Sequence, residues 1–154
     1  MSYLAELNVG RLVAPVHDPK VHDFVANLNR INALAERSKG FVWRLKGDNG
    51  NATEITLDSD PSLIANLSVW ESAKDLEDFV WNTVHKRFYQ RKASWFEPLS
   101  EPHFVMWQVD ETHRPTVDEA EQRLMHLRAH GSTDHAFGWD YLPSTRLWLE
   151  QRCA

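Results

Sequence analysis

The stretch LIANLSVWESAKDLEDFVWNTVHKRFYQRKASWFEP, residues 63–98, decides how this chain folds. Its first eight residues are mostly apolar and predict a strand over 63–70. Ser72, followed three residues later by Asp75, resembles a capping box, in which a hydroxyl and a carboxylate satisfy the free backbone donors of a helix's first turn. The residues that then recur at three- and four-residue spacing are Leu76, Phe79, Val80 and Thr83. The stretch therefore predicts a strand followed by a helix that packs one apolar face on a sheet.

The second half of the same stretch mixes large rings with polar side chains. The residues concerned are Trp81, His85, Arg87, Tyr89, Arg91 and Trp95. Packing alone does not explain this density of polar groups among rings, since rings of this kind suit pockets as well as cores. We expect a functional site to draw on this segment.

Upstream of the stretch, the pattern predicts further strands. Residues 3–9, YLAELNV, alternate, which places Leu4, Glu6 and Asn8 on one face and the apolar side chains between them on the other. Residues 41–46, FVWRLK, predict a short strand, and 54–57 predict a small extra strand.

A helix is predicted between the first two strands. Asp18 followed by Pro19 supplies an acceptor at the cap and a proline at the first helical position, and Gly40 is expected to end the helix. Its buried stripe is predicted at Val21, Phe24, Val25, Leu28, Ile31, Leu34 and Ala35.

Downstream, residues 103–109 predict the last strand. Thr116 with Glu119 matches a capping box, and the helix that it opens is expected to close at Gly131. The remaining segment, 132–154, is aromatic without a clear period.

The predicted order is strand, helix, strand, strand, helix, strand, with an added C-terminal helix. This is the ferredoxin-like βαββαβ arrangement, an α+β fold with a four-stranded antiparallel sheet. A chain of 154 residues with 42% hydrophobic content is one domain's worth, so we assign residues 1–154 to a single domain.

Both faces of the predicted sheet look largely apolar. Phe41, Trp43 and Leu45 alternate with Val42, and the strand 103–109 shows the same mixture. A sheet with helices on one face needs a cover on the other if that face is apolar. A second copy of the chain would supply it, so we expect a homodimeric α/β barrel.

The composition limits the classes of molecule that we expect the protein to bind. The formal net charge of −5 argues against a nucleic-acid backbone or an anionic membrane as partner, because both need a concentrated basic surface. Cys153 is the single cysteine, which gives no sign of an oxidising compartment. No run approaches the length of a membrane helix and the first residues lack a signal-peptide pattern, so we expect a cytoplasmic protein.

Several segments together resemble a known family. They are NVGRL (8–12), INALAERSKGFVWRL (31–45), SVWES (68–72), VHKRFYQRKASWFEP (84–98), RPTVDEAEQRLMHLRAHG (114–131) and AFGW (136–139). The chain is similar in these motifs to the uncharacterised DUF3291 family, which resembles the dimeric α/β-barrel superfamily of antibiotic-biosynthesis and heme-degrading monooxygenases. The resemblance implies a ferredoxin-like dimer. It does not imply an activity, since such folds host unrelated functions.

The resemblance also bears on a cofactor. Heme-degrading relatives carry a histidine in their second helix, near where His85 lies, and a strand-one asparagine that Asn8 resembles. The spacing from Trp70 to His85 differs from that of the heme enzymes. We therefore predict no cofactor and keep heme binding as an alternative.

The candidate site is built from polar residues on strands. Glu6, Asn8 and Arg44 are expected among Trp70, Met106 and Phe104 in an apolar pocket on the face that lines the barrel. A structural alternative is a buried ion pair between Glu6 and Arg44, with Asn8 bonded to a neighbouring backbone. We assign catalytic roles to His85, Asn8 and Arg44. Ligand-binding roles are assigned to Glu6, Trp43, Trp70, Arg87, Arg91, Trp95, Met106 and Trp107.

A metal site is not expected. His126 and His130 are four residues apart, which suits two ligands on one helix face, but no third ligand accompanies them at a convincing spacing. The sequence leaves two main hypotheses. One is a binding protein or cofactor-independent monooxygenase for a hydrophobic or aromatic small molecule, and the other is a dimeric structural or interaction protein without catalysis.

Overall fold

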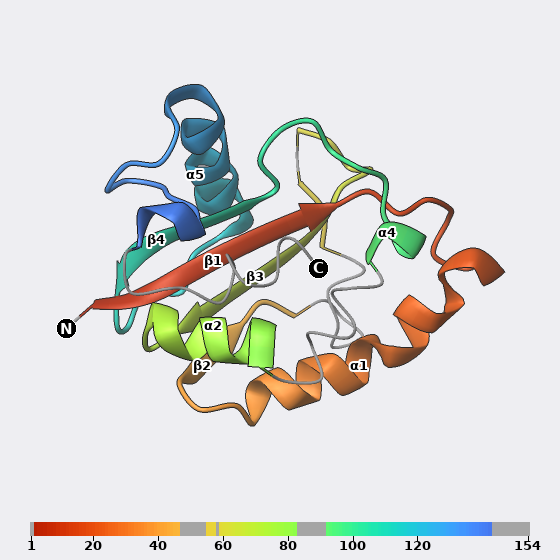
Figure 1. Cartoon of the computed structure of the whole chain (residues 1–154), viewed down its shortest axis with the longest axis horizontal. Coiled ribbons are helices and arrows are strands. Elements are labelled where there is room, and N and C mark those ends of the chain that lie inside the picture. The colour runs from red at the N-terminus through yellow and green to blue at the C-terminus, as the bar shows by residue number, and fades with distance from the viewer. Residues whose placement is uncertain (1, 47–54, 58, 83–91, 143–154) are drawn as a thin grey trace.

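The computed structural model describes residues 2–46, 55–57, 59–82 and 92–142 (Figure 1). Four strands form one antiparallel sheet in the order β2-β3-β1-β4. The strands are β1 (Ser2–Gly10), β2 (Phe41–Arg44), β3 (Ile64–Trp70) and β4 (Phe104–Asp110). With a helix after β1 and another after β3, this is the ferredoxin-like α+β fold that the sequence predicts.

The helices begin where polar caps meet apolar periodicity. They are α1 (His22–Glu36), α2 (Ala73–Asn82), the short α4 (Lys92–Trp95) and α5 (Val117–His130), with 3-10 turns η1 (Pro19–Val21) and η2 (Trp139–Tyr141). The Ser72 hydroxyl accepts from the Asp75 amide at 3.1 Å and opens α2. The Thr116 hydroxyl accepts from the Glu119 amide at 3.2 Å and opens α5, which ends before Gly131 as predicted.

The bounds of α1 differ from the prediction at both ends. Asp18 does cap a turn, because its carboxylate accepts from the Lys20 amide at 2.8 Å, but Pro19–Val21 wind as a 3-10 turn and the α-helix follows. At the other end α1 stops at Glu36, and Gly40 lies in the turn that leads into β2, with φ of 83°.

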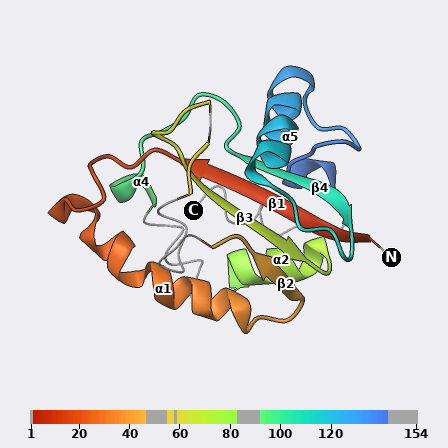
Figure 2. The ribbon, with the colours of Figure 1, turned by 180° about the vertical axis from the view of Figure 1, so that it is seen from behind.

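The sheet separates two layers of helix. Helices α1 and α2 lie on one face and α5 on the other, as the two opposite views in Figures 1 and 2 show. Leu4, Trp70 and Met106 pack with α1 and α2 in one buried cluster. The strand residues between them pack with α5 in a second cluster. The alternation in 3–9 therefore assigns the two faces correctly, but both faces carry helices.

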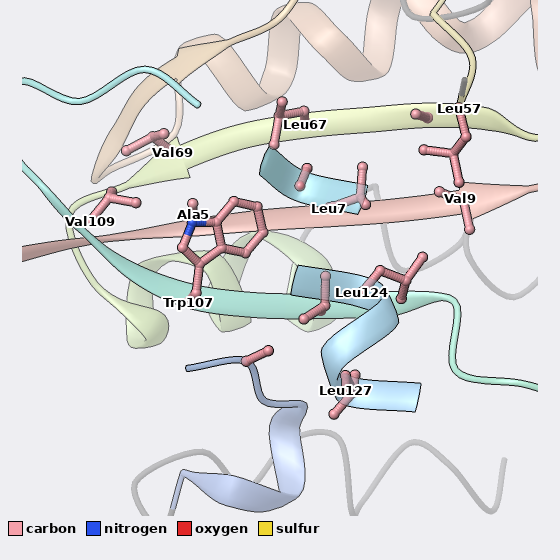
Figure 3. Close-up of a cluster of buried hydrophobic side chains, with 14 of the residues drawn as sticks. Ala5, Leu7, Val9, Leu57, Leu67, Val69, Trp107, Val109, Leu124 and Leu127 are labelled. Atoms are coloured by element: carbon pink, nitrogen blue, oxygen red, sulfur yellow. The ribbon is translucent and has the colours of Figure 1, made fainter. Parts of the chain in front are cut away.

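The cluster under α5 is fully apolar at its centre (Figure 3). Leu7, Leu67 and Trp107 have no exposed surface, and Leu124 of α5 lies against them with none either. The predicted need for a second copy to cover this face is thus wrong for these residues, because α5 of the same chain buries them. The homodimer stays a prediction that burial within one chain does not require.

The segment after α5 returns to the sheet. Phe137 exchanges two backbone hydrogen bonds with Met106 of β4, at 2.8 and 2.9 Å, and its side chain is buried. Trp139 then stacks on Phe104 with ring centroids 5.3 Å apart. This segment closes the outer edge of β4 on the side of α1 and α2.

Candidate functional site

A cavity of about 600 Å³ lies between the sheet and helices α1 and α2. Its size is that of sites that enclose drug-sized molecules. Rings dominate the walls, and those that line it are Phe24, Phe41, Trp70, Phe79, Trp81, Trp95, Phe96, Phe104 and Trp139. The cavity therefore offers a flat, apolar ligand extensive contact with rings.

Glu6 is the buried acid of this cavity. It lies in the middle of β1, opposite Ser68 of β3 and opposite Met106 of β4, and Ser68 is in turn opposite Arg44 of β2. The polar side chains of Arg44, Ser68 and Glu6 thus lie in one row across the sheet, on the face that α1 and α2 cover. Glu6 lines the cavity and is only 4% exposed.

The Glu6 carboxylate is held by a chain of hydrogen bonds. The Ser68 hydroxyl donates to Glu6 Oε1 at 2.6 Å, and the Trp70 indole donates to Ser68 Oγ at 2.9 Å. Asn8 Nδ2 donates to the other oxygen, Oε2, at 3.1 Å. Both carboxyl oxygens of Glu6 are thus hydrogen-bonded, and Ser68 and Asn8 each line the cavity too.

Burial raises the pKa of Glu6 to about 7, and the hydrogen bonds from Ser68 and Asn8 act in the opposite direction without cancelling it. Desolvation disfavours the charged form of a carboxyl, so an isolated buried acid keeps its proton to higher pH. Near neutral pH this group exists in both forms. That is the condition under which a carboxyl both accepts and returns a proton efficiently.

Arg44 lines the same cavity, but its ion pair is with Glu36 rather than with Glu6. Its Nε donates to Glu36 Oε1 at 2.8 Å, across the turn between α1 and β2. This bond holds the pKa of Glu36 below its ordinary value. The alternative ion pair between Glu6 and Arg44 is not formed, and Asn8 bonds to Glu6 itself rather than to backbone.

Six of the residues expected in the pocket line the cavity, namely Glu6, Asn8, Arg44, Trp70, Trp95 and Phe104. Met106 is buried beside Glu6 in the layer under α1 and α2, without lining the cavity. The pocket does not lie on the open face of a barrel as expected, because α1 and α2 cover these residues.

Trp43 and Trp107 do not belong to this cavity. Both pack in the cluster on the other face of the sheet, and the Trp107 indole donates to Glu119 Oε2 of α5 at 3.0 Å. The sequence analysis assigns both to the same pocket, and this is wrong. The alternation along β4 places Trp107 on the other face, and the irregular register of β2 between Phe41 and Trp43 does the same for Trp43. His85, Arg87 and Arg91 lie outside the described residues.

Ser68 is one polar lining residue that the sequence analysis does not predict, and Asn32 is another. Asn32 lies on α1, is 6% exposed and lines the cavity together with Leu28, Ile31 and Ala35. These four positions share one helix face by their spacing of three and four. The signal in the sequence is an amide side chain inside the predicted apolar stripe. An interpretation based on apolar periodicity alone does not detect it.

The histidines of α5 gather near the surface. The ring of His126 lies 4.5 Å from that of His130 and 4.6 Å from that of His135, measured between centroids. His135 also faces Arg123, and burial together with these neighbours lowers its pKa. Among the residues that the structure describes, no group of three or more metal-ligating side chains is placed to hold an ion.

No helix within the described ranges is long and apolar enough to cross a bilayer.

Comparison with known proteins adds a family and a fold. The DUF3291 family, described as a domain of unknown function, matches residues 3–152. A conserved protein from Methanosarcina mazei Go1 has a similar structure, with a TM-score of 0.50 and 11% identity over 71% of this chain and 93% of that one. No curated protein matches this chain in sequence.

Two further solved structures are similar at lower scores. PA3566 from Pseudomonas aeruginosa gives a TM-score of 0.48 and 16% identity over 71% of this chain and 94% of that one. A Nitrosomonas europaea protein provisionally named as an antibiotic biosynthesis monooxygenase gives 0.42 and 15%, over 70% and 86%. At these identities the likeness concerns the fold.

Proposed function

This chain belongs to the DUF3291 family, and from the site described above we propose that it binds a hydrophobic, ring-bearing small molecule in the cavity and that Glu6 exchanges a proton with it. The observation that carries the proposal is a single buried carboxyl, held by Ser68 and Asn8, on the wall of an otherwise aromatic cavity. A group in an apolar pocket whose pKa is moved to neutrality by burial is a characteristic functional candidate.

The surroundings of Glu6 support a chemical role over a purely structural one. A buried acid with a raised pKa lowers the stability of the folded state at pH 8, because its ionised form is poorly solvated there. A core that needed only packing would gain stability from an apolar side chain at this position. A ligand that fills this aromatic space would displace water from Glu6, so a proton that Glu6 removes from the ligand is not exchanged at once with solvent.

The reactions open to such a site include oxygenation without a bound metal, the reaction suggested by the resemblance to antibiotic-biosynthesis monooxygenases. Glu6 would take a proton from an activated CH₂ group, and the carbanion would give electrons to dissolved O₂ and form a C–O bond. The peroxide, protonated by Glu6, would lose its second C–H proton as the O–O bond breaks. The sum is R₂CH₂ + O₂ giving R₂C=O + H₂O, so consumption of one O₂ per substrate is its signature.

The described polar groups beside Glu6 in the cavity do not include a usual heme ligand. The buried polar groups of the cavity are the Glu6 carboxyl with the hydroxyl and amides near it, whereas heme iron is usually held by imidazole, thiolate or thioether. His103 is the histidine of the described lining, and His85 lies outside the described residues. We derive no step through heme.

Narrowing the cavity should weaken ligand binding. Ala35 lines the cavity at 8% exposure, so Ala35→Leu adds three carbons to occupied ligand space. We expect the affinity for the neutral dye Nile red to fall by about tenfold, the effect of a clash of about one to two kcal/mol. Fluorescence titration measures it.

Ala33→Leu is the matched control, because Ala33 is exposed on the same helix two residues away. It should leave the affinity for Nile red within about twofold, as surface substitutions generally have small effects. Equal affinities for the two variants would place the dye outside the cavity and remove the basis for the proposal.

Proton exchange with Glu6 should link ligand affinity to pH. The hydroxyl of 2-naphthol can donate to the ionised carboxylate, so its affinity should rise by about fivefold between pH 6 and 8, since charge-assisted hydrogen bonds are the stronger ones. Naphthalene lacks the hydroxyl and further desolvates the carboxylate, so its affinity should fall over the same range.

Glu6→Gln should make both pH profiles flat in the same fluorescence titrations. Parallel profiles for 2-naphthol and naphthalene in the wild-type protein would show that Glu6 does not meet the ligand, and would leave a cavity without the proposed proton transfer.

A further inference from the structure

Glu6 is a buried carboxyl without a counter-ion. Ser68 and Asn8, which donate hydrogen bonds to it, are both neutral. No cationic side chain pairs with it among the residues that the structure describes. Glu6 nevertheless lines the cavity and keeps 4% of its surface exposed, so a ligand in the cavity lies against it. A buried charge without a counter-ion is costly, and a ligand of opposite charge offsets that cost.

Two other charged residues of the described lining do have partners of opposite sign. Arg44 donates to Glu36 at 2.8 Å, and Glu97 lies 3.8 Å from Arg11. Neither pair compensates the negative charge that Glu6 carries when it is ionised. A cationic ligand would complete a pair with Glu6, whereas an anionic ligand would bring a like charge into an apolar space.

Aromatic rings lie beside this carboxyl. The Trp70 indole donates to Ser68 Oγ, and the Ser68 hydroxyl donates in turn to Glu6. Phe41 and Phe79 contact the Trp70 ring, with centroids 5.4 and 5.3 Å from it, and all three rings line the cavity. The face of an aromatic ring attracts a cation within about 6 Å of its centroid, and aromatic cages hold alkylated ammonium groups in this way.

We propose that the ligand is an organic ammonium ion with alkyl groups on its nitrogen, and that this nitrogen pairs with Glu6 beside the ring of Trp70. This inference rests on the proposed function, because it names the chemical class of the molecule that binds in the same cavity. The apolar part of the ligand packs against the remaining rings. A positive charge next to Glu6 favours the ionised carboxylate, which is the form that accepts a proton from the ligand.

The test compares two probes of the same shape. Benzyltrimethylammonium carries N⁺ where neopentylbenzene carries a neutral carbon, and displacement of bound Nile red measures the affinity of both. In Glu6→Gln at pH 8 the affinity for the cation should fall by about tenfold, because a charge pair in an apolar site contributes more than an exposed one. The affinity for neopentylbenzene should not fall.

The pH dependence gives a second measurement. Burial raises the pKa of Glu6 to about 7, so its ionised fraction rises about tenfold between pH 6 and 8. The affinity of the wild-type protein for benzyltrimethylammonium should rise by the same factor, and that for neopentylbenzene should fall. His103 also lines the cavity and titrates near this range. A rise that persists in Glu6→Gln would therefore belong to His103 and overturn the pairing with Glu6.

Glu71→Gln is the matched control, since Glu71 is exposed and lies outside the described lining. It should bind both probes as the wild-type protein does. Should Glu6→Gln fail to fold, His103→Gln takes its place. The rise in cation affinity with pH should remain in His103→Gln, and its loss there would overturn the pairing.

The outcomes separate the two proposals. Equal loss of both probes in Glu6→Gln, or no loss of the cation, overturns the ammonium assignment and leaves cavity binding in place. Failure of benzyltrimethylammonium alone to displace Nile red from the wild-type protein does the same. If neither probe displaces the dye, and Ala35→Leu and Ala33→Leu bind it equally, both proposals are overturned.

Discussion

Glu6→Gln should make the free energy of unfolding nearly independent of pH between 5 and 8 relative to the wild-type protein, which should lose about 3 kcal/mol as the pH rises from 4 to 8. The folded carboxyl holds its proton up to a pKa of about 7, whereas the unfolded one releases it at its ordinary value of 4.5. Between these values the folded state binds more protons, so stability falls with rising pH. The loss is complete above pH 7.

Other titratable groups change the stability in a different pH range or in the opposite direction. Glu36, Asp60 and Asp110 have lowered pKa values, so their contributions are lost only as the pH falls below their ordinary range. His135 also has a lowered pKa, which favours the folded state as the pH rises, but its ring is exposed and solvent screens the effect. The difference between wild type and Glu6→Gln isolates the single carboxyl.

Urea unfolding at pH 5, 6, 7 and 8 measures this difference. The amide that Glu6→Gln introduces would keep an acceptor for Ser68 or Asn8, so at pH 8 the variant should be at least as stable as the wild type. Glu71→Gln, at an exposed position, is the control and should retain the wild-type slope. A wild-type protein without a falling slope would mean that Glu6 titrates as an ordinary carboxyl, and the case for its chemical role would be lost.

The sequence predicts the fold well because its signals are local. Alternation in 3–9 places Glu6 and Asn8 on one face, and the caps at Ser72 and Thr116 begin α2 and α5. These patterns act within a few residues, and the structure follows them. The ferredoxin-like order of elements is then enough to bring β1 and β3 together at the centre of the sheet.

What the sequence could not supply is the assignment of helices to faces. Nothing local says that α5 crosses to the face of Leu7 and Leu67, because its apolar stripe fits either face equally well. The alternation along β4 and the irregular register of β2 place Trp107 and Trp43 on the face that α5 covers, so they miss the cavity. The choice of face for α5 also leaves Glu6 under α1 and α2, where a single chain encloses the site without a second copy.

No local pattern in the sequence predicts which residues of different elements line the same cavity. Asn32 and Glu6 lie on different elements, and only the packing of α1 on the sheet brings them to one space. Trp139 reaches the cavity because Phe137 pairs with Met106 after α5, a contact with no local pattern. Glu6, Asn8 and Trp70 line the cavity because their strand positions alone determine their face.

Gly40→Ala should destabilise the protein by about 3 kcal/mol, from backbone strain at positive φ together with an overlap of side chains. Gly40 has φ of 83°, a conformation that an alanine adopts only with strain. A Cβ at this position would also overlap the side chain of Asp75, whose amide bonds to the Ser72 hydroxyl at the start of α2. The Gly40 carbonyl accepts from the Glu71 amide at 2.7 Å, so the turn after α1 is joined directly to the start of α2.

Gly131→Ala measures the cost of backbone strain without an overlap of side chains. Gly131 has φ of 74° and ψ of −172° at the end of α5, but a Cβ there meets nothing within 4 Å, so the change should cost the backbone strain alone, about 2 kcal/mol and less than at Gly40. Urea unfolding gives both values. Because Leu76, Phe79 and Val80 of α2 line the cavity, Gly40→Ala should also weaken Nile red binding, whereas Gly131→Ala should not. Equal costs for the two glycines would mean that Asp75 moves aside freely, and that the link from the α1 turn to α2 does not hold the cavity wall in place.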